Sequence, residues 1–596
     1  MPTKSLSFLL PLVAAALTLH AADKSKSDKA AVAVDPYTEV QPATETLDLS
    51  AYQRIRDEGL NHSHVMDFAS ALMDGIGPRL TGSPNLKKAN EWTRDTLTKI
   101  GLENAHLEDW GEFGLGWQQL NTWARMVTPD TAVLIVQATP WSPSTPGPVT
   151  GDVTFVSIQS EKDFDTYKGK LAGKVVLFGA MREVPPVDKA LFERYTDKEL
   201  EDLAEFQVTA GAAGPGGLPP DMQKRLQAYI ERNKLIDKVA QFFADEKVAA
   251  VIEPSRDAKN GGGSGGTIFD DNGATLGRTP YVAEKAVKIP VAVAAIESYG
   301  RLFRLTQAHV PTTVEIDIET KVSGEHEHGF DTVAEIPGTD PALKDQVVMV
   351  GGHLDSWIAG TGATDNGAGT VVAMEVVRIF KALGIKPRRT IRIALWTGEE
   401  QGIFGSKGYV TQHFGSAQLS TEPDQLQLPE FMRRATGPLT VKPEQKLISG
   451  YFNIDNGTGK IRGIYTQGNY AIAPIFAQWM APLKDLGVTT VTNRNTGGTD
   501  HLSFDAVGIP GFQFIQDDMD YESRTHHSNE DTVERLQPAD LKQIATVEAI
   551  FVYNAAQRDQ MLPRKPLPQP DLEQEKRKPI EGIFPGAVPP PPPGVK

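Results

Sequence analysis

The sequence predicts an α/β protein: a mostly parallel, doubly wound sheet, with a β-rich domain inserted ahead of it. Three observations support this. From about residue 325 to 562, apolar strands alternate with helical segments, a pattern typical of a parallel sheet covered on both faces. Between residues 128 and 320, short β-rich runs are separated by Pro/Gly loops. The chain has 596 residues, more than one hydrophobic core normally supports, so at least two domains are expected.

Composition narrows the classes of partner and of metal site. The apolar fraction of 40% and the charged fraction of 23% are those of a globular protein. A net charge of −16 argues against nucleic acid or an anionic membrane as the main partner. The sequence contains no cysteine, so disulfides and thiolate metal sites are excluded. Any zinc must therefore be bound by His, Asp and Glu.

The N-terminal stretch, residues 1–22, has the pattern of a secretory signal peptide. Lys4 precedes an apolar run from Leu6 to Leu19, and small residues follow at Ala21 and Ala22. The apolar run is too short to span a bilayer comfortably, which leaves an uncleaved anchor as the weaker possibility. With no cysteine after this stretch, a lipoprotein anchor is excluded. We expect an exported protein, secreted or periplasmic, that has no membrane partner once the signal is cleaved.

The chain then divides into five further parts. Residues 23–45 form a polar leader. Residues 46–127 form an N-terminal part, in which Leu47–Leu102 is helical in pattern. A charged helical insert at about 196–247 interrupts the β-rich region 128–320. The glycine-rich stretch 260–266 has no following Lys-Ser/Thr and no helix start, so it predicts a flexible surface loop rather than a phosphate cradle. Residues 325–562 hold the strand–helix alternation. The Pro-rich tail, residues 563–596, is expected to be extended and exposed.

Residues with metal-ligand side chains follow the predicted strands QVVMVGG, TIRIALWT, KLISGYFNI and GIPGFQFI. In open α/β sheets, ligands bind beyond the carboxyl ends of the strands. Six candidates map to that rim, although they are scattered over more than 170 positions of the chain. They are His353, Asp365, Glu399, Glu400, Asp455 and His527.

These residue types match a site for two divalent cations. Two cations about 3.5–4 Å apart need one carboxylate that bridges them, with imidazoles and further carboxylates to complete each set of ligands. Five residues suffice for this. The sixth, a glutamate beside the attacking water, can act as general base. The adjacent pair Glu399 and Glu400 suits this division, because one can bind metal while its neighbour remains free.

The motifs around these residues resemble those of metallopeptidase family 28, the di-zinc exopeptidases, and within it the carboxypeptidase Q group and bacterial aminopeptidases. The resemblance extends over nearly all of the chain after the signal peptide, including the stretch GPRLTG near the start. It implies that residues 46–127 belong to the peptidase domain, that 128–320 are a protease-associated domain, and that 325–562 are the catalytic domain. The motifs are GGHLDSW, GATDNGAGT, LWTGEEQG, NIDNG, GGTDHLSF and HHSNEDT.

The resemblance also implies a ligand set for two Zn²⁺ per chain. His353 and Asp455 would bind one ion. Glu400 and His527 would bind the other. Asp365 would bridge both.

Three further roles follow from the resemblance. Glu399 would be the general base and acid. Asp355 would orient the imidazole of His353, unless it is a simple turn residue. Many relatives have Tyr just before the last histidine ligand, but this chain has His526, which would supply the hydrogen-bond donor for the oxyanion unless another group does. The spacing favours His527 over His526 as the ligand.

Two additional residue pairs are expected near the site or at the domain junction. Asp500 and His501, in GGTDHLSF, are expected near the site, in a substrate-contacting or a purely structural role. His326 and His328 are expected in a solvent-facing linker at the domain junction.

We therefore expect hydrolysis of short peptides, by release of N-terminal residues or by splitting of dipeptides. Carboxypeptidase-type cleavage is the second possibility within the same chemistry. The residues also leave open a receptor-like binding protein on the same scaffold, a different di-zinc hydrolase such as a phosphatase, and a one-zinc cyclase-like transferase. A homodimer remains open.

Overall fold

The computed structural model describes residues 35–205, 220–271, 276, 280–422, 425–427, 433 and 436–567. They belong to one compact unit, which begins at Asp35. The predicted signal peptide, the first part of the leader and the tail beyond residue 567 lie outside the described residues. Among those that are described, no helix combines the length and the apolar character needed to cross a membrane.

The central sheet contains the four strands that the sequence predicts, all parallel to one another. Their order is β16, β13, β9, β10, with His353 level with Trp396 at the carboxyl ends of β9 and β10. The two strands beyond β16 were not predicted: β14, which is antiparallel to β16, and β15, which is parallel to β14. The bounds are β9 (Val347–His353), β10 (Thr390–Trp396), β13 (Ile448–Asn453), β14 (Ile461–Tyr465), β15 (Thr490–Thr492) and β16 (Gly511–Gln516).

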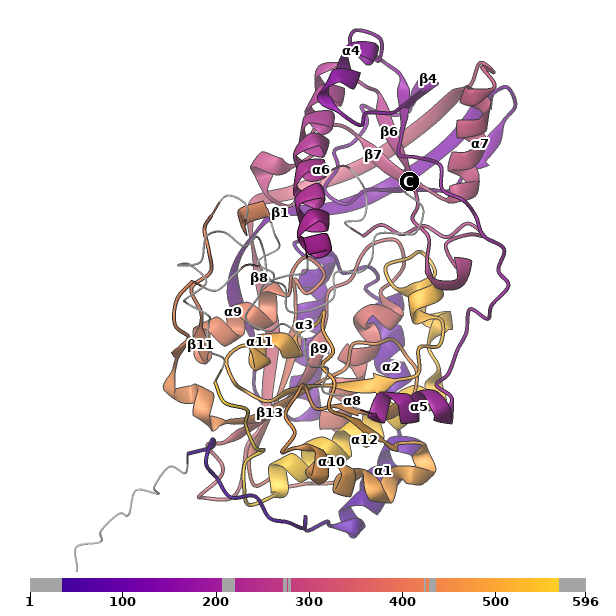
Figure 1. The fold of residues 1–596 in the computed structure, drawn as a ribbon. Helices are drawn as coiled ribbons and strands as arrows, with labels where there is room; N and C mark the ends of the chain where they lie inside the picture. The colour runs from indigo at the N-terminus through magenta and orange to yellow at the C-terminus, as the bar shows by residue number, and fades with distance from the viewer. Residues whose placement is uncertain are drawn as a thin grey trace, which may run out of the picture. The chain divides into compact units, whose positions relative to one another are not determined.

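Helices cover both faces of this sheet, as the doubly wound prediction requires. Side chains of α1, α8 and α12 pack in one apolar core against one face, and these three helices lie together in Figure 1. Side chains of α9 and α11 pack in a second core against the opposite face. The bounds are α1 (Leu49–Asn61), α8 (Ala368–Ala382), α9 (Phe404–His413), α11 (His501–Asp505) and α12 (Pro538–Gln557).

The predicted helical pattern, Leu47–Leu102, ends where a long strand begins. α3 starts at Pro84, where the Ser83 hydroxyl accepts a hydrogen bond from Leu86 N at 3.1 Å, and it ends at Gly101 in the left-handed conformation. β1 follows directly. The bounds are α2 (Val65–Ala69), η1 (Ser70–Asp74), α3 (Pro84–Ile100) and β1 (Glu103–Thr128); α10 (Ala473–Met480) lies later in the chain.

Two long antiparallel strands, β1 and β8 (Thr313–Ile336), connect the central sheet with the inserted region. One end of β8 pairs with β10, and the other end pairs with β4. The predicted β-rich runs form strands there, and α5 and α6 occupy the predicted helical insert. The bounds are β2 (Ala132–Leu134), β3 (Val136–Ala138), β4 (Val149–Val156), α4 (Phe164–Tyr167), β5 (Val175–Phe178), α5 (Asp197–Ala204), α6 (Pro220–Asp245), β6 (Ala250–Pro254), β7 (Val291–Ala294) and α7 (Ile296–Gln307).

Two expectations about this region were wrong. The glycine stretch 260–266 is not a free surface loop: Gly261, Gly262 and Gly263 are buried, and a Cβ on Gly262 would lie 1.6 Å from the carbonyl oxygen of Ser523. Glycine is needed there because the two backbones touch. His326 and His328 face solvent as expected, but they lie within β8 rather than in a linker, and each pairs with a carboxylate of β1.

The buried carboxyl of Glu548, on α12, gives a testable pH dependence of stability. Neither of its oxygens has a hydrogen-bond partner among the described residues, and burial raises its pKa well above the ordinary value. Above the unfolded pKa of about 4.3, unfolding releases a proton that the folded protein retains, so this group lowers stability as pH rises. Glu548→Gln should therefore stabilise the protein by about 1–3 kcal/mol at pH 8 and by less at pH 5. Thermal unfolding at both pH values measures this, and an equal gain at both would contradict it.

Candidate metal centre

The fold brings the six predicted residues to one rim of the central sheet. His353 ends β9, Glu399 and Glu400 follow β10, and Asp455 lies two residues beyond the end of β13. Asp365 lies in η5 (Ala363–Gly367), immediately before α8, and His527 follows η10 (Tyr521–Thr525), which comes after β16.

A close backbone contact sets the position of Asp365 relative to Asp455. A Cβ on Gly369, in the first turn of α8, would lie 2.2 Å from the carbonyl oxygen of Ile454. Only glycine therefore allows α8 to approach the end of β13 this closely. The motif GATDNGAGT thus has a steric reason for this glycine.

Asp365 lies between two histidine–carboxylate pairs. Its Oδ1 is 3.3 Å from His353 Nε2, and its Oδ2 is 3.1 Å from His527 Nε2. His353 Nε2 is also 3.4 Å from Asp455 Oδ1, and His527 Nε2 is 2.9 Å from Glu400 Oε2. One carboxylate therefore faces both halves of the site.

The other nitrogen of each imidazole fixes which nitrogen carries the proton. Nδ1 of His527 lies 3.1 Å from the Asp271 carboxylate, and Nδ1 of His353 lies 3.1 Å from the carbonyl oxygen of Asp355. Both partners only accept hydrogen bonds, so Nδ1 is the protonated nitrogen in each ring. Nε2 of each ring then directs a lone pair at the carboxylates.

The Nε2 lone pairs of the two imidazoles and the carboxylate oxygens point at one another, so a positive charge is needed between them. Burial alone would lower the pKa of His353, but the charge of Asp455 and hydrogen bonds with Asp355 and Asp365 raise it well above its ordinary value. The pKa of His527 is raised in the same way, chiefly by Glu400. Without a metal, a second proton must therefore occupy each ring. A cation bound to Nε2 can take the place of that proton.

Two buried oxygens also fit a cation. Asp365 Oδ2 and Glu400 Oε1 accept no well-formed hydrogen bond from the described residues. Three overlapping groups of side chains have ligand atoms close enough to share an ion: Asp365, His526 and His527; His353, Glu399 and Asp455; His353, Asp365 and Glu400. Imidazole nitrogens and carboxylate oxygens without thiolates are a suitable donor set for zinc. The residues present therefore fit a divalent metal.

Glu399 lies at the edge of this cluster of side chains. Its Oε2 is 3.9 Å from His353 Nε2, and the residue is 9% exposed. Burial raises the pKa of Glu399 well above its ordinary value, and the charges of Asp455 and Asp500 raise it further. A carboxylate in this environment is well suited to accept a proton.

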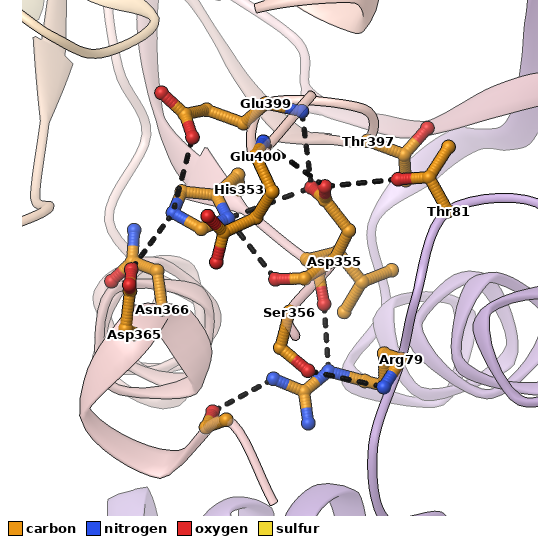
Figure 2. Close-up of polar contacts among 12 residues, drawn as sticks. Arg79, Thr81, His353, Asp355, Ser356, Asp365, Asn366, Thr397, Glu399 and Glu400 are labelled. Atoms are coloured by element: carbon orange, nitrogen blue, oxygen red, sulfur yellow. Dashed lines mark hydrogen bonds and ion pairs between the residues drawn. The ribbon is translucent and has the colours of Figure 1, made fainter. Parts of the chain in front are cut away.

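Asp355 does more than the sequence predicts. Its carboxylate is 3.5 Å from Nδ1 of His353, while it accepts hydrogen bonds from Thr81 Oγ1 at 3.0 Å and from the backbone nitrogens of Glu399 and Glu400 at 3.3 Å each. Figure 2 shows Asp355 between His353, Thr81 and these two glutamates. Asp355 therefore positions the glutamates as well as the imidazole.

The loop before α3 supports the loop between His353 and Asp365. The guanidinium of Arg79 is fully buried and donates to the carbonyl oxygens of Leu354, Thr361 and Gly362 at 2.6–2.8 Å. These carbonyls belong to the loop between His353 and Asp365, so Arg79 fixes the shape of that loop (Figure 2).

His526 stands slightly further from the centre than His527. Its Nε2 is 3.6 Å from Asp365 Oδ2, and its ring lies 3.8 Å from that of His527 and 4.8 Å from that of Tyr521. Burial and the neighbouring His527 lower the pKa of His526 to about 3, so this imidazole is neutral. A neutral imidazole can donate one hydrogen bond, which leaves the predicted oxyanion role chemically open.

Asp500 and His501 differ in role: one residue lies near the site, and the other has a structural role. Asp500 is buried, burial raises its pKa to about 7, and its charge acts on Glu399 and His353. His501 points elsewhere: its Nε2 accepts a hydrogen bond from the Gln467 amide at 2.5 Å, and burial lowers its pKa to about 4. Asp500 thus belongs to the surroundings of the site, and His501 has a structural role.

Several residues at the site had no role predicted from the sequence. Asp271 and Arg256 come from the inserted region, and Thr81 and Arg79 from the N-terminal helical part. Asp531 lies inside the motif HHSNEDT, which could have drawn attention to it. It accepts hydrogen bonds from the backbone nitrogens of Thr364 at 2.5 Å and Asp365 at 3.2 Å.

Comparisons with known proteins agree with this fold. Residues 331–552 match the model of peptidase family M28. Carboxypeptidase Q of Mus musculus is 27% identical over 495 residues, which cover 83% of this chain and 86% of that protein. Aminopeptidase YwaD of Bacillus subtilis is 24% identical over 309 residues, covering 52% of this chain and 60% of that protein. A crystal structure of a peptidase M28 precursor from Shewanella amazonensis shares the fold, with a TM-score of 0.56, 22% identity, and coverage of 87% of this chain and 98% of that one.

Proposed function

Because this chain carries a peptidase family M28 domain over residues 331–552, we propose that it is a zinc-dependent exopeptidase that uses two Zn²⁺ to hydrolyse short peptides. The observation that supports this most is the position of Asp365, whose two carboxylate oxygens each face one histidine. A single carboxylate shared in this way suits a pair of ions.

The residues would divide between the two ions as follows. His353 and Asp455 would hold one zinc, and Glu400 and His527 the other, while Asp365 would contact both. Bound zinc supplies acidification of a coordinated water and polarisation of the peptide carbonyl.

The chain's own side chains then move the protons and orient the groups. Glu399 accepts the proton of the attacking water and afterwards delivers it to the leaving amine. His526 donates a hydrogen bond to the oxygen that becomes negatively charged. Asp355 keeps Glu399 in place through its backbone nitrogen.

We propose cleavage at the N-terminal residue, or splitting of dipeptides, because the surroundings of the site are acidic. Asp500 and Asp455 lie near Glu399, and a free α-ammonium group would complement them. Two arginines near the site are engaged: Arg79 donates to backbone carbonyls, and Arg256 pairs with Asp271 at 2.9 Å. Carboxypeptidase-type cleavage is the second candidate, since the similarity to carboxypeptidase Q extends over 83% of this chain. The apolar run near the N-terminus supports the further proposal that the protein is exported.

A substrate panel with matched blocking groups tests this proposal. We expect the purified protein to hydrolyse a free dipeptide and an aminoacyl-anilide but not the same dipeptide with a blocked N-terminus. A chelator should remove the activity, and added Zn²⁺ should restore it. Cleavage of the blocked dipeptide with no action on the anilide would establish carboxypeptidase action instead. A protein that binds zinc but hydrolyses none of the three would be a binding protein.

A further inference from the structure

A short segment of the inserted region, residues 267–271, lies against the loop that carries His527. Phe269 forms an antiparallel bridge with Ser528. On one side of this bridge, the backbone of Ile268 accepts a hydrogen bond from Asn529 N at 3.0 Å and donates one to Asn529 Oδ1 at 2.8 Å. On the other side, Asp270 N donates to the carbonyl oxygen of His527 at 3.3 Å. These bonds fix the segment in register with the metal loop.

This register places the carboxylate of Asp271 against the His527 imidazole. Asp271 Oδ2 lies 3.1 Å from Nδ1 of His527, on the side of the ring opposite to Asp365 and Glu400. Arg256, also from the inserted region, holds this carboxylate with its guanidinium at 2.9 Å. The same guanidinium lies 4.0 Å above the ring of Phe269 and donates to the carbonyl oxygen of His526 at 3.3 Å.

We infer that Asp271 is a positioning residue for the metal ligand His527, and that the inserted region thereby completes the metal centre. The inference rests on the zinc chemistry of the proposed function. Asp271 keeps the proton on Nδ1 and aims Nε2 at the metal position. A carboxylate partner of this kind orients a histidine ligand and makes it a stronger donor.

The two halves of the centre differ in this respect. Nδ1 of His353 has a neutral carbonyl oxygen as its nearest partner, at 3.1 Å, and the Asp355 carboxylate lies further off, at 3.5 Å. Nδ1 of His527 has a carboxylate as its nearest partner, at 3.1 Å, and an arginine holds that carboxylate. A charge-assisted hydrogen bond is roughly twice as strong as a neutral one. Loss of the Asp271 charge should therefore weaken one of the two zinc ions selectively, namely the one bound by His527.

The variant Asp271→Asn tests this inference, with Asp257→Asn as the matched control. Asp257 is another carboxylate of the inserted region that faces an arginine, Arg182 at 3.5 Å, but it is not placed in the metal site. Zinc affinity is measured by competition with a chelator, and cobalt(II) substitution reports the ligand field of each site by its absorption spectrum. Asp271→Asn should lose about 10–100-fold in affinity for one ion and leave the other unchanged, with an altered cobalt spectrum. Asp257→Asn should behave as the wild type.

A second variant protects the test against a folding defect. The metal-free melting temperature shows whether Asp271→Asn is folded. If Asp271→Asn is not folded, Arg256→Gln is used instead. This substitution removes the arginine that holds Asp271 but keeps the Asp271 carboxylate. It should reduce the affinity for the same zinc ion selectively, by a smaller factor. Wild-type affinity for both ions in folded Asp271→Asn, or in Arg256→Gln where it replaces that variant, would overturn the inference.

The wild-type protein, measured in parallel, separates this inference from the proposed function. Wild type that binds no zinc would overturn both. Wild type that binds two zinc ions and hydrolyses no peptide would overturn the proposed function alone.

Discussion

Glu399→Gln should lower kcat by about 10²–10⁴-fold and leave the zinc content at the wild-type level. The substitution keeps the size and shape of the side chain but removes its ability to accept a proton. Glu399 is 3.9 Å from His353 Nε2, at the border of the ligand cluster, so its loss should not release metal. Steady-state kinetics on the best substrate of the panel, together with zinc per chain by elemental analysis, measure both quantities.

The neighbouring Glu400→Gln is the matched control, because it makes the same chemical change one residue further on. Glu400 Oε2 lies 2.9 Å from His527 Nε2, and its Oε1 is a buried oxygen without a hydrogen-bond partner among the described residues. Its loss should lower the zinc content as well as the activity. Full activity in Glu399→Gln would show that the general base is another group. Zinc loss in Glu399→Gln with retention in Glu400→Gln would show that the two roles are exchanged.

Asp365→Asn should abolish binding of both zinc ions and reduce activity to background. Each carboxylate oxygen of Asp365 serves one half of the centre, and an amide nitrogen in place of either oxygen is a donor that repels a cation. Zinc titration by calorimetry on the metal-free variant measures the loss directly.

Asp455→Asn is the comparison for Asp365→Asn. Asp455 Oδ1 lies 3.4 Å from His353 Nε2, so this carboxylate serves one half of the centre. Its loss should weaken one ion and leave the other. Equal effects of the two substitutions would contradict a bridging role for Asp365.

The rim of the sheet could be predicted from the sequence because strand ends carry a strong signal. Each of the four parallel strands is a short apolar run with a His, Asp or Glu at its end or within three residues after it, and parallel strands end at the same edge. His353 and the Glu399–Glu400 pair follow this rule directly. The doubly wound architecture follows from the same alternation, which the cores on both faces of the sheet bear out.

The supporting residues could not be predicted in this way because they come from distant segments. Thr81 contacts Asp355, 274 positions away along the chain, and Asp271 contacts His527, 256 positions away. Neither lies at a strand end or at a helical spacing that would mark it. Their roles depend on how the N-terminal loop and the inserted region pack on the catalytic rim, and this packing has no local pattern.

The buried glycine stretch could not be predicted either, because its role depends on a contact with a distant segment. Residues 260–263 have the composition of a loop, and a Gly-rich run is usually flexible. In the structure, Gly262 is required because the backbone of Ser523 approaches it, a contact between segments about 260 residues apart. Strands β14 and β15 were missed because they are short, with five and three residues.

In the proposed arrangement, Asp365 joins two metal ions held by His353, Asp455, Glu400 and His527. Anomalous diffraction at the zinc absorption edge, from crystals of the zinc-loaded protein, tests it most directly. We predict two peaks about 3.5–4 Å apart, one within bonding distance of each carboxylate oxygen of Asp365. A single peak, or peaks that Asp365 does not touch, would contradict it.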